Sequence, residues 1–196
     1  MDPGLKLRLF VALDLPEPAR AALAAFRSAV ADPALWRPVP DEALHLTLAF
    51  LGHRPEADVE RIAALLQAAP ANAPRLTLGR ALGLPLKRPR VLTAAIVDHD
   101  GTLTGLQRWV SRELAAAGLY DPGKREFRPH ATVARLRPDA KVAGGKLPGP
   151  APVTFYGEAM TLYRSQLRRE VARYEPLARL ALREWSSDPD AEARRD

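Results

Sequence analysis

The hydrophobic residues of the first segment alternate with the period of a β-strand. In residues 7–13 the odd positions are leucine or valine, so that one face of the segment is apolar throughout. After Pro16 the spacing changes: apolar residues recur every three or four positions up to Val30, which predicts an amphipathic helix. The same two periods predict further strands at residues 44–51, 75–82, 90–97, 131–136, 153–163 and within 171–182, and further helices after Pro55 and over residues 102–117.

Glycine and proline mark the ends of these elements and the connections between them. Gly52 is predicted to end the second strand, and Gly118 suits the C-terminal cap of the third helix. Residues 121–129 and 138–152 are predicted loops, and the second is long enough to form a mobile flap. Because strands and helices alternate irregularly, the pattern favours an α+β fold over a doubly wound parallel sheet.

The composition is that of an ordinary soluble globular protein. Of 196 residues, 47% are hydrophobic and 27% are charged, which excludes wholesale disorder. The chain has no cysteine, so disulfides, thiolate zinc sites and a cysteine nucleophile are excluded. The formal net charge of +6 is compatible with an anionic partner but does not identify one.

The N-terminal apolar segment does not have the form of an export signal. It is short, contains Arg8 and runs into Asp14 without a small-residue cleavage site. No stretch of the sequence approaches the roughly 20 apolar residues that a membrane span needs. We therefore expect a cytoplasmic protein that contacts no membrane.

A tetrapeptide pattern, His-x-Thr-x, occurs twice within predicted strands. The first copy begins at His45 (HLTL) and the second at His130 (HATV). Because alternate residues of a strand share a face, His45 and Thr47 project together, and His130 and Thr132 do the same. Each motif therefore predicts a strand with one polar face and one apolar face.

One His-x-Thr pair alone is more often a satisfied polar pair on a half-exposed strand than a functional site. The chain has only eight threonines, however, and two coincidental copies in apolar strands would be rare. Two facing imidazoles can remove a proton from an attacking oxygen and deliver one to a leaving oxygen. Hydroxyl groups beside them can bind the non-bridging oxygens of a phosphate, so the repeat predicts metal-free phosphodiester chemistry.

On these motifs the chain resembles the two-histidine phosphoesterase superfamily, and in particular its RNA 2′,3′-cyclic phosphodiesterase branch, also called 2′-5′ RNA ligases. The segments that carry the resemblance are residues 8–16 (RLFVALDLP), 44–52 (LHLTLAFLG), 127–135 (FRPHATVAR), 161–165 (TLYRS) and 173–182 (RYEPLARLAL). One departure is Ala131, where the family more often has a larger apolar residue. That position faces the predicted core, so the departure concerns packing and not chemistry.

The resemblance implies a bilobal α+β fold, in which two mainly antiparallel sheets are flanked by helices and the active cleft lies between the lobes. We therefore expect residues 1–185 to form a single bilobal domain, followed by a disordered tail over residues 186–196. The implied reaction is metal-independent hydrolysis of a terminal RNA 2′,3′-cyclic phosphate to a 2′-phosphomonoester, and reversible 2′-5′ RNA ligation is a second reaction that the resemblance allows. The implied partners are RNA ends with a cyclic phosphate or small cyclic nucleotides. No cofactor is implied, and we expect a monomer.

The resemblance also implies roles for the motif residues. The catalytic set consists of His45, His130, Thr47 and Thr132. Our hypothesis is that His130 is the base that activates water and that His45 is the acid that protonates the leaving 3′ oxygen. The two threonines would then hold phosphate oxygens.

Three further residues are candidate substrate ligands. The family reading makes Arg135 a phosphate ligand, although strand parity places it opposite His130 unless a bulge intervenes. Phe50 has the parity of core residues, so core packing and stacking on a nucleobase both remain open. Arg164 and the basic turn at residues 87–90 either contact RNA phosphates or are solvated surface charges.

Other interpretations compete with this one. A metal-dependent hydrolase needs converging ligands with spacing such as His-x-x-x-His, which the sequence lacks, and a P-loop pattern is also absent. His53 and His99 have no threonine partner, lie in predicted turns and are expected to be exposed and without a role. A non-catalytic RNA-end or nucleotide-binding module is the remaining alternative, although binding alone would not require two titratable groups.

Overall fold

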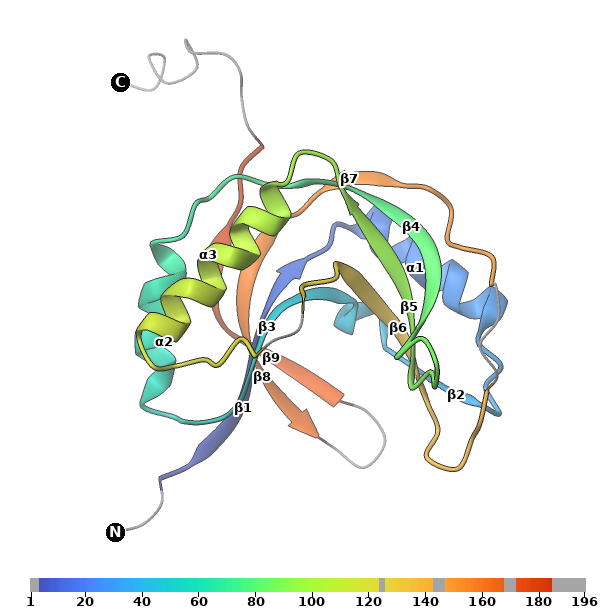
Figure 1. Cartoon of the computed structure of the whole chain (residues 1–196), viewed down its shortest axis with the longest axis horizontal. Helices are drawn as coiled ribbons and strands as arrows, with labels where there is room; N and C mark the ends of the chain where they lie inside the picture. The colour runs from blue at the N-terminus through green and yellow to red at the C-terminus, as the bar shows by residue number, and fades with distance from the viewer. Residues whose placement is uncertain (1–3, 124–125, 143–146, 168–171, 185–196) are drawn as a thin grey trace.

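The protein folds into one curled antiparallel sheet with helices on its outer face (Figure 1). A computed structural model describes residues 4–123, 126–142, 147–167 and 172–184. The strands run in the order β7-β4-β5-β6-β3-β1-β8-β9, and β2 pairs with β6. Their bounds are β1 (Lys6–Asp14), β2 (Trp36–Pro38), β3 (His45–Pro55), β4 (Arg75–Leu84), β5 (Val91–Asp98), β6 (His130–Leu136), β7 (Thr154–Tyr156), β8 (Ala159–Leu167) and β9 (Ala172–Ala181).

The sheet consists of two halves that meet at a single residue pair. Strands β1, β3, β8 and β9 form one half, and β4, β5, β6 and β7 form the other. Strand β3 meets β6 only at Leu46 and Ala131, so the two expected sheets are continuous at this point. The α+β fold predicted from the sequence is confirmed, and all the strand pairs named here are antiparallel.

In the part of the chain that the structure describes, three α-helices cover the convex side of the sheet (Figure 1). They are α1 (Glu17–Val30), α2 (Asp58–Gln67) and α3 (Thr102–Ala116). Helix α1 follows β1 but packs against β6 and β7 in the other half, whereas α3 follows β5 but packs against β3 as well as β5. Each helix buries its predicted apolar stripe against the sheet, and the concave side is left for polar and aromatic side chains.

Strand β1 provides much of the core. Its odd positions from Leu7 to Leu13 are buried, as the alternating pattern predicts. Phe10 and Ala12, on the concave side, are also buried, and the Phe10 ring lies against the rings of Tyr163 and Tyr174. The concave face is therefore apolar along the middle of this strand.

Two strand predictions were wrong, and the reasons differ. Residues 153–163 form two strands, β7 and β8, because the chain passes from one half of the sheet to the other between them. At this passage a Cβ atom on Gly157 would lie 2.8 Å from the Leu13 side chain, so that any larger residue would displace this buried leucine. Gly52 does not end β3, which continues to Pro55; its φ of 71° instead accommodates an irregularity in the pairing with β1.

Some expectations concern parts of the chain that are not described. The tail at residues 186–196 and residues 143–146 of the predicted flap lie outside the described residues. None of the helices in the described part of the chain has the length and apolarity that crossing a bilayer requires.

Candidate active site

The two motif strands lie side by side at the centre of the sheet. Leu46 and Ala131, which form the one β3–β6 pair, are the second residues of the two motifs and are fully buried. Because neighbouring strand residues point to opposite faces, the histidine and threonine of each motif project from the concave face. The fold thus brings together His45, Thr47, His130 and Thr132, which the sequence separates by 85 residues from one histidine to the other.

Each motif is followed by a bulge at the same relative position. On β3, Ala12 pairs with Thr47 and Val11 with Ala49, so Leu48 is an additional residue. On β6, Thr93 pairs with Thr132 and Leu92 with Ala134, so Val133 is the additional residue. In both strands the extra residue and the alanine after it are buried, and the alternation of faces shifts by one position.

The bulges bring two further predicted residues to the concave face. Phe50 and Arg135 each lie five positions after the histidine of their motif, and both are exposed. Phe50 is 62% exposed and its ring lies 6.1 Å from that of Phe10, so core packing is excluded for it. The bulge that Arg135 required is present, and its charge contributes to lowering the pKa of His45.

His45 lies in an aromatic surrounding. Its ring centroid is 5.0 Å from that of Phe10 and 5.2 Å from that of Tyr174. Nδ1 lies 2.8 Å from the carbonyl oxygen of Ala43, in the 3-10 helix η1 (Asp41–Ala43) before β3. A carbonyl only accepts, so Nδ1 carries the proton and Nε2, 3.1 Å from Thr47 Oγ1, is left to exchange protons with a ligand.

The surroundings of His45 favour its neutral form. Burial lowers its pKa from 6.5 to about 4. The hydrogen bond to Ala43 and the carboxylate of Asp14 oppose this change, and the charges of Arg135 and His130 add to it. His45 is therefore uncharged at neutral pH in the protein alone.

His130 repeats the hydrogen-bonding pattern of His45 on the other strand. Its Nδ1 lies 2.7 Å from the carbonyl oxygen of Arg128, two residues earlier in the chain. The partner of His45 is likewise two residues earlier. In both rings the backbone fixes the tautomer of the neutral imidazole with the proton on Nδ1, which leaves Nε2 without a proton and able to accept one.

Asp14 is a residue of the site that the sequence analysis did not single out. It pairs with His45 in the register of β1 and β3. Its carboxylate accepts hydrogen bonds from Thr161 Oγ1 at 2.8 Å and from the Tyr163 hydroxyl at 2.9 Å, and Arg179 Nε lies 3.4 Å away. Burial and this carboxylate raise the pKa of Tyr163, which therefore remains a donor. The TLYRS segment contained a signal, since Thr161 and Tyr163 share a face.

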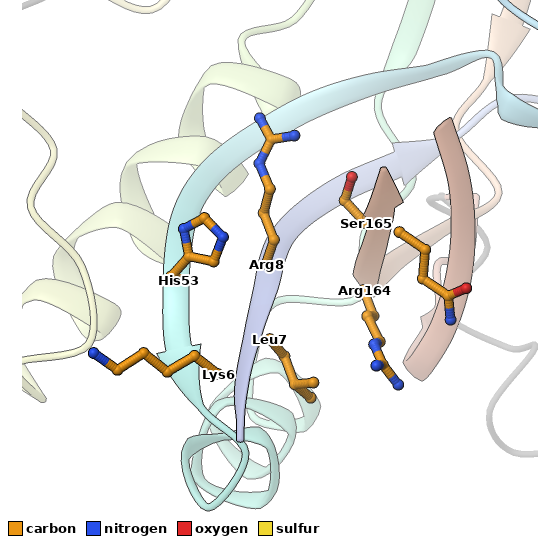
Figure 2. A pocket seen from close by; sticks show the side chains of 7 residues that line it. Lys6, Leu7, Arg8, His53, Arg164 and Ser165 are labelled. Carbon is orange, nitrogen blue, oxygen red and sulfur yellow. The ribbon is translucent and has the colours of Figure 1, made fainter. Parts of the chain in front are cut away.

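The fold does not bring Arg164 to the histidine pair. It lies on β8, 3.6 Å from Glu175, and lines a cavity of about 390 Å³ near the start of β1 (Figure 2). The whole lining consists of Lys6, Leu7, Arg8, His53, Arg164, Ser165 and Gln166. His53 is exposed as expected, but it lies within β3 opposite Arg8 and not in a turn.

The other basic and histidine candidates are exposed, and none has a side-chain hydrogen bond with the motif residues among those described. Lys87, Arg88 and Arg90 are exposed in the connection between β4 and β5. His99 is exposed and its Nε2 lies 2.7 Å from Thr77 Oγ1. Among the described residues, no three or more His, Asp or Glu side chains form a group that could hold a metal ion.

Comparisons with known proteins agree with this arrangement. A family model described as LigT like Phosphoesterase matches residues 13–93. The RNA 2′,3′-cyclic phosphodiesterase of Thermus thermophilus is 35% identical over 190 residues, which span 90% of this chain and 91% of that protein. The Escherichia coli protein of the same name is 34% identical over 176 residues, which span 89% of this chain and 96% of that protein. The chain belongs to the LigT-like phosphoesterase family.

The similarity of this LigT-like protein to its relatives includes the tertiary structure. It superposes on the crystal structure of Escherichia coli LigT in complex with 3′-AMP with a TM-score of 0.78 at 31% identity, covering 91% of this chain and 99% of that chain. The superfamily inferred from the two His-x-Thr motifs is confirmed. The expectation that the LigT-like chain is an enzyme is confirmed as well.

Proposed function

We propose that the protein hydrolyses a terminal 2′,3′-cyclic phosphate of RNA to a 2′-phosphomonoester, using the two histidines as a general acid–base pair. The observation that carries the proposal is the meeting of two His-x-Thr pairs on one face at the β3–β6 junction. The names of the bacterial relatives, RNA 2′,3′-cyclic phosphodiesterases, support the choice of substrate. In 2′-5′ ligation a 5′ hydroxyl would take the place of water as the nucleophile at the same site, so that the bond to the 3′ oxygen breaks in the same way.

In this mechanism one histidine takes up a proton and the other releases one. Water attacks phosphorus, and its proton passes to Nε2 of His130. The bond from phosphorus to the 3′ oxygen breaks, and Nε2 of His45 delivers a proton to that oxygen. The products are a 2′-phosphate and a free 3′ hydroxyl, and each positioned histidine contributes roughly 10²–10⁴-fold to the rate.

Of the charges around His45, that of Asp14 supports its assignment as the acid, whereas those of Arg135 and His130 lower the pKa of His45. Asp14 lies opposite it and favours the protonated ring. Burial acts in the other direction, so the negative charge of the bound phosphate must provide the remaining stabilisation of the imidazolium. His45 is then charged only when substrate is in place, which is the state in which an acid is required.

The remaining candidates complete the substrate site. Thr47 and Thr132 donate their hydroxyl protons to non-bridging phosphate oxygens. Arg135 offers a planar fork of donors to the same phosphate. Phe50 presents an exposed ring on which the terminal base stacks. We infer that RNA ends or small cyclic nucleotides bind here, and the cytoplasmic location and the monomeric state remain predictions.

The test is turnover of a 2′,3′-cyclic nucleotide in the presence of EDTA. We expect hydrolysis to a 2′-phosphate in the wild type, and a loss of roughly 10²–10⁴-fold in both His45→Ala and His130→Ala. His99→Ala, which alters an exposed histidine in the connection between β5 and α3, is the matched control and should retain wild-type turnover. Near-wild-type turnover in either motif variant would refute the mechanism. Tight binding of the nucleotide without turnover would instead favour a non-catalytic binding module.

A further inference from the structure

The cavity near the start of β1 opens where two strands diverge. Leu9 and Arg164 form the last register pair between β1 and β8. Strand β1 nevertheless extends back to Lys6, and β8 extends forward to Leu167 in its pairing with β9. Figure 1 shows β8 and β9 leaving the sheet as a hairpin beside β1. We call the cavity of about 390 Å³ between them the fork site.

The fork site is the continuation of the proposed active site along β1. Arg8 lies two residues before Phe10 and therefore shares its face. The Phe10 ring contacts both His45, at 5.0 Å, and Phe50, at 6.1 Å. Two residues of a strand span about 7 Å. Arg8 therefore lies about 7 Å along β1 from Phe10, in the direction away from His45.

The lining of the fork site suits an anion. Lys6, Arg8 and Arg164 supply positive charge. Figure 2 shows Arg8 beside His53, whereas Arg164 projects from β8 in the opposite direction, in keeping with its pairing with Leu9. In the described part of the chain no carboxylate lies within 4 Å of Lys6 or Arg8, whereas Arg164 is paired with Glu175. The lining contains no aromatic side chain other than the His53 imidazole, so it offers little surface for stacking a base. A phosphate group fits the donors of Arg8 and the neighbouring His53 better than a base does.

We propose that the fork site binds the backbone phosphate 5′ to the terminal nucleotide, and so makes the protein prefer the end of an RNA chain over a cyclic mononucleotide. The inference rests on the proposed function, because it assumes that the cyclic phosphate lies between the histidines and the terminal base on Phe50. From that position the chain continues over Phe10 towards Arg8. A mononucleotide has no further phosphate and leaves Arg8 without a contact.

The experiment compares two substrates in two arginine variants. The ratio of kcat/KM for an oligoribonucleotide with a 2′,3′-cyclic phosphate end to kcat/KM for 2′,3′-cyclic AMP is measured in wild type, Arg8→Ala and Arg108→Ala. Loss of one charged phosphate contact should lower this ratio at least about tenfold in Arg8→Ala and reduce the salt dependence for the oligonucleotide by about 0.7 in log–log slope. Arg108 is an exposed arginine of α3, and its substitution makes the same change in charge without changing the ratio.

Each outcome decides the inference separately from the proposed function. An unchanged ratio in Arg8→Ala, or an equal fall for both substrates, would overturn the fork site. Lys6→Ala, at an exposed position, is a second variant that should lower the ratio in the same direction even if Arg8→Ala folds poorly. If the wild type hydrolysed neither substrate, the proposed function would fail. Weaker binding of a 3′-phosphorylated oligonucleotide to Arg8→Ala than to Arg108→Ala would then still support the fork site, and equal binding would overturn it.

Discussion

The two motif strands, β3 and β6, repeat one local design in two different environments. Both place a histidine and a threonine on the concave face, both fix Nδ1 by the carbonyl two residues earlier, and both bulge after the threonine. His45 is surrounded by aromatic rings and lies opposite Asp14, whereas His130 follows the predicted loop at residues 121–129. The repeated design supplies the two histidines of the proposed acid–base pair, and their surroundings differ.

The two motif strands also differ in the residue that each bulge exposes. The position five residues after the histidine is Phe50 on β3 and Arg135 on β6. An aromatic ring on one side and a guanidinium on the other match the two parts of a nucleotide, the base and the phosphate. The comparison teaches that two strands of one local design can present different chemistry at equivalent positions, as the proposed binding of an asymmetric substrate requires.

The largest effect on activity in this comparison should come from replacing Arg135 on β6. Arg135→Ala removes the forked donor and should lower kcat/KM for a 2′,3′-cyclic nucleotide about 100-fold, the equivalent of a hydrogen-bonded charge contact. Arg135→Lys keeps the charge but not the fork and should recover only part of the loss. Arg108→Ala is the control in the same steady-state assay. Full activity of Arg135→Ala would show that the bulge on β6 has no role in phosphate binding.

The next effect is the pH dependence that the buried His45 gives to the free energy of unfolding. The folded-state pKa of about 4 lies below the unfolded value of 6.5, so the unfolded chain binds the proton first as the pH falls. This contribution to the free energy of unfolding is fully present above pH 6.5 and is lost towards pH 4, by at most about 1.4 kcal/mol per pH unit.

Urea denaturation at several pH values measures this dependence. His45→Gln should have a shallower slope than the wild type between pH 6.5 and 4, and the difference isolates His45 from the carboxylates that titrate in the same range. Equal slopes would mean that the environment of His45 does not disfavour its charged form.

A smaller effect is expected on the β3 side. Phe50→Ala removes a stacking surface and should raise KM about tenfold with little change in kcat, within the roughly 1–3 kcal/mol that one stacked base contributes. Because the ring is 62% exposed, the free energy of unfolding should change by less than about 1 kcal/mol. Phe50→Tyr keeps the ring and should bind normally. A large loss of stability with an unchanged KM would restore core packing as the role of Phe50.

The smallest change is expected for Asp14→Asn, which keeps the shape of the side chain and removes its charge. The carboxylate raises the pKa of His45, so its loss should lower that pKa further and make the protonated acid scarcer. Activity at neutral pH should fall a few-fold, and the alkaline limb of the kcat profile, which reports the acid in the enzyme–substrate complex, should move to lower pH. A uniform loss at every pH would instead indicate that Asp14 acts only through folding.

Several elements followed from local patterns alone. The helix stripes and the odd positions of β1 were predicted because a period of two or of 3.6 residues depends only on neighbours in the chain. Gly118 was predicted as a helix cap and has a φ of 70°, which glycine adopts freely. By contrast β2 (Trp36–Pro38) was missed, because a three-residue strand with a proline has no periodicity to detect.

The sequence by itself determined the chemistry of the site: two copies of His-x-Thr, each on a strand with one apolar face, and a family resemblance that the relatives confirm. Only the tertiary structure decided where Phe50, Arg135, Asp14 and Arg8 lie. The physical reason is that strand parity is a local rule, whereas a bulge is set by the register with a partner strand. Pairing with β1 and β5 shifted both motif strands by one position and turned two ambiguous side chains towards the histidines.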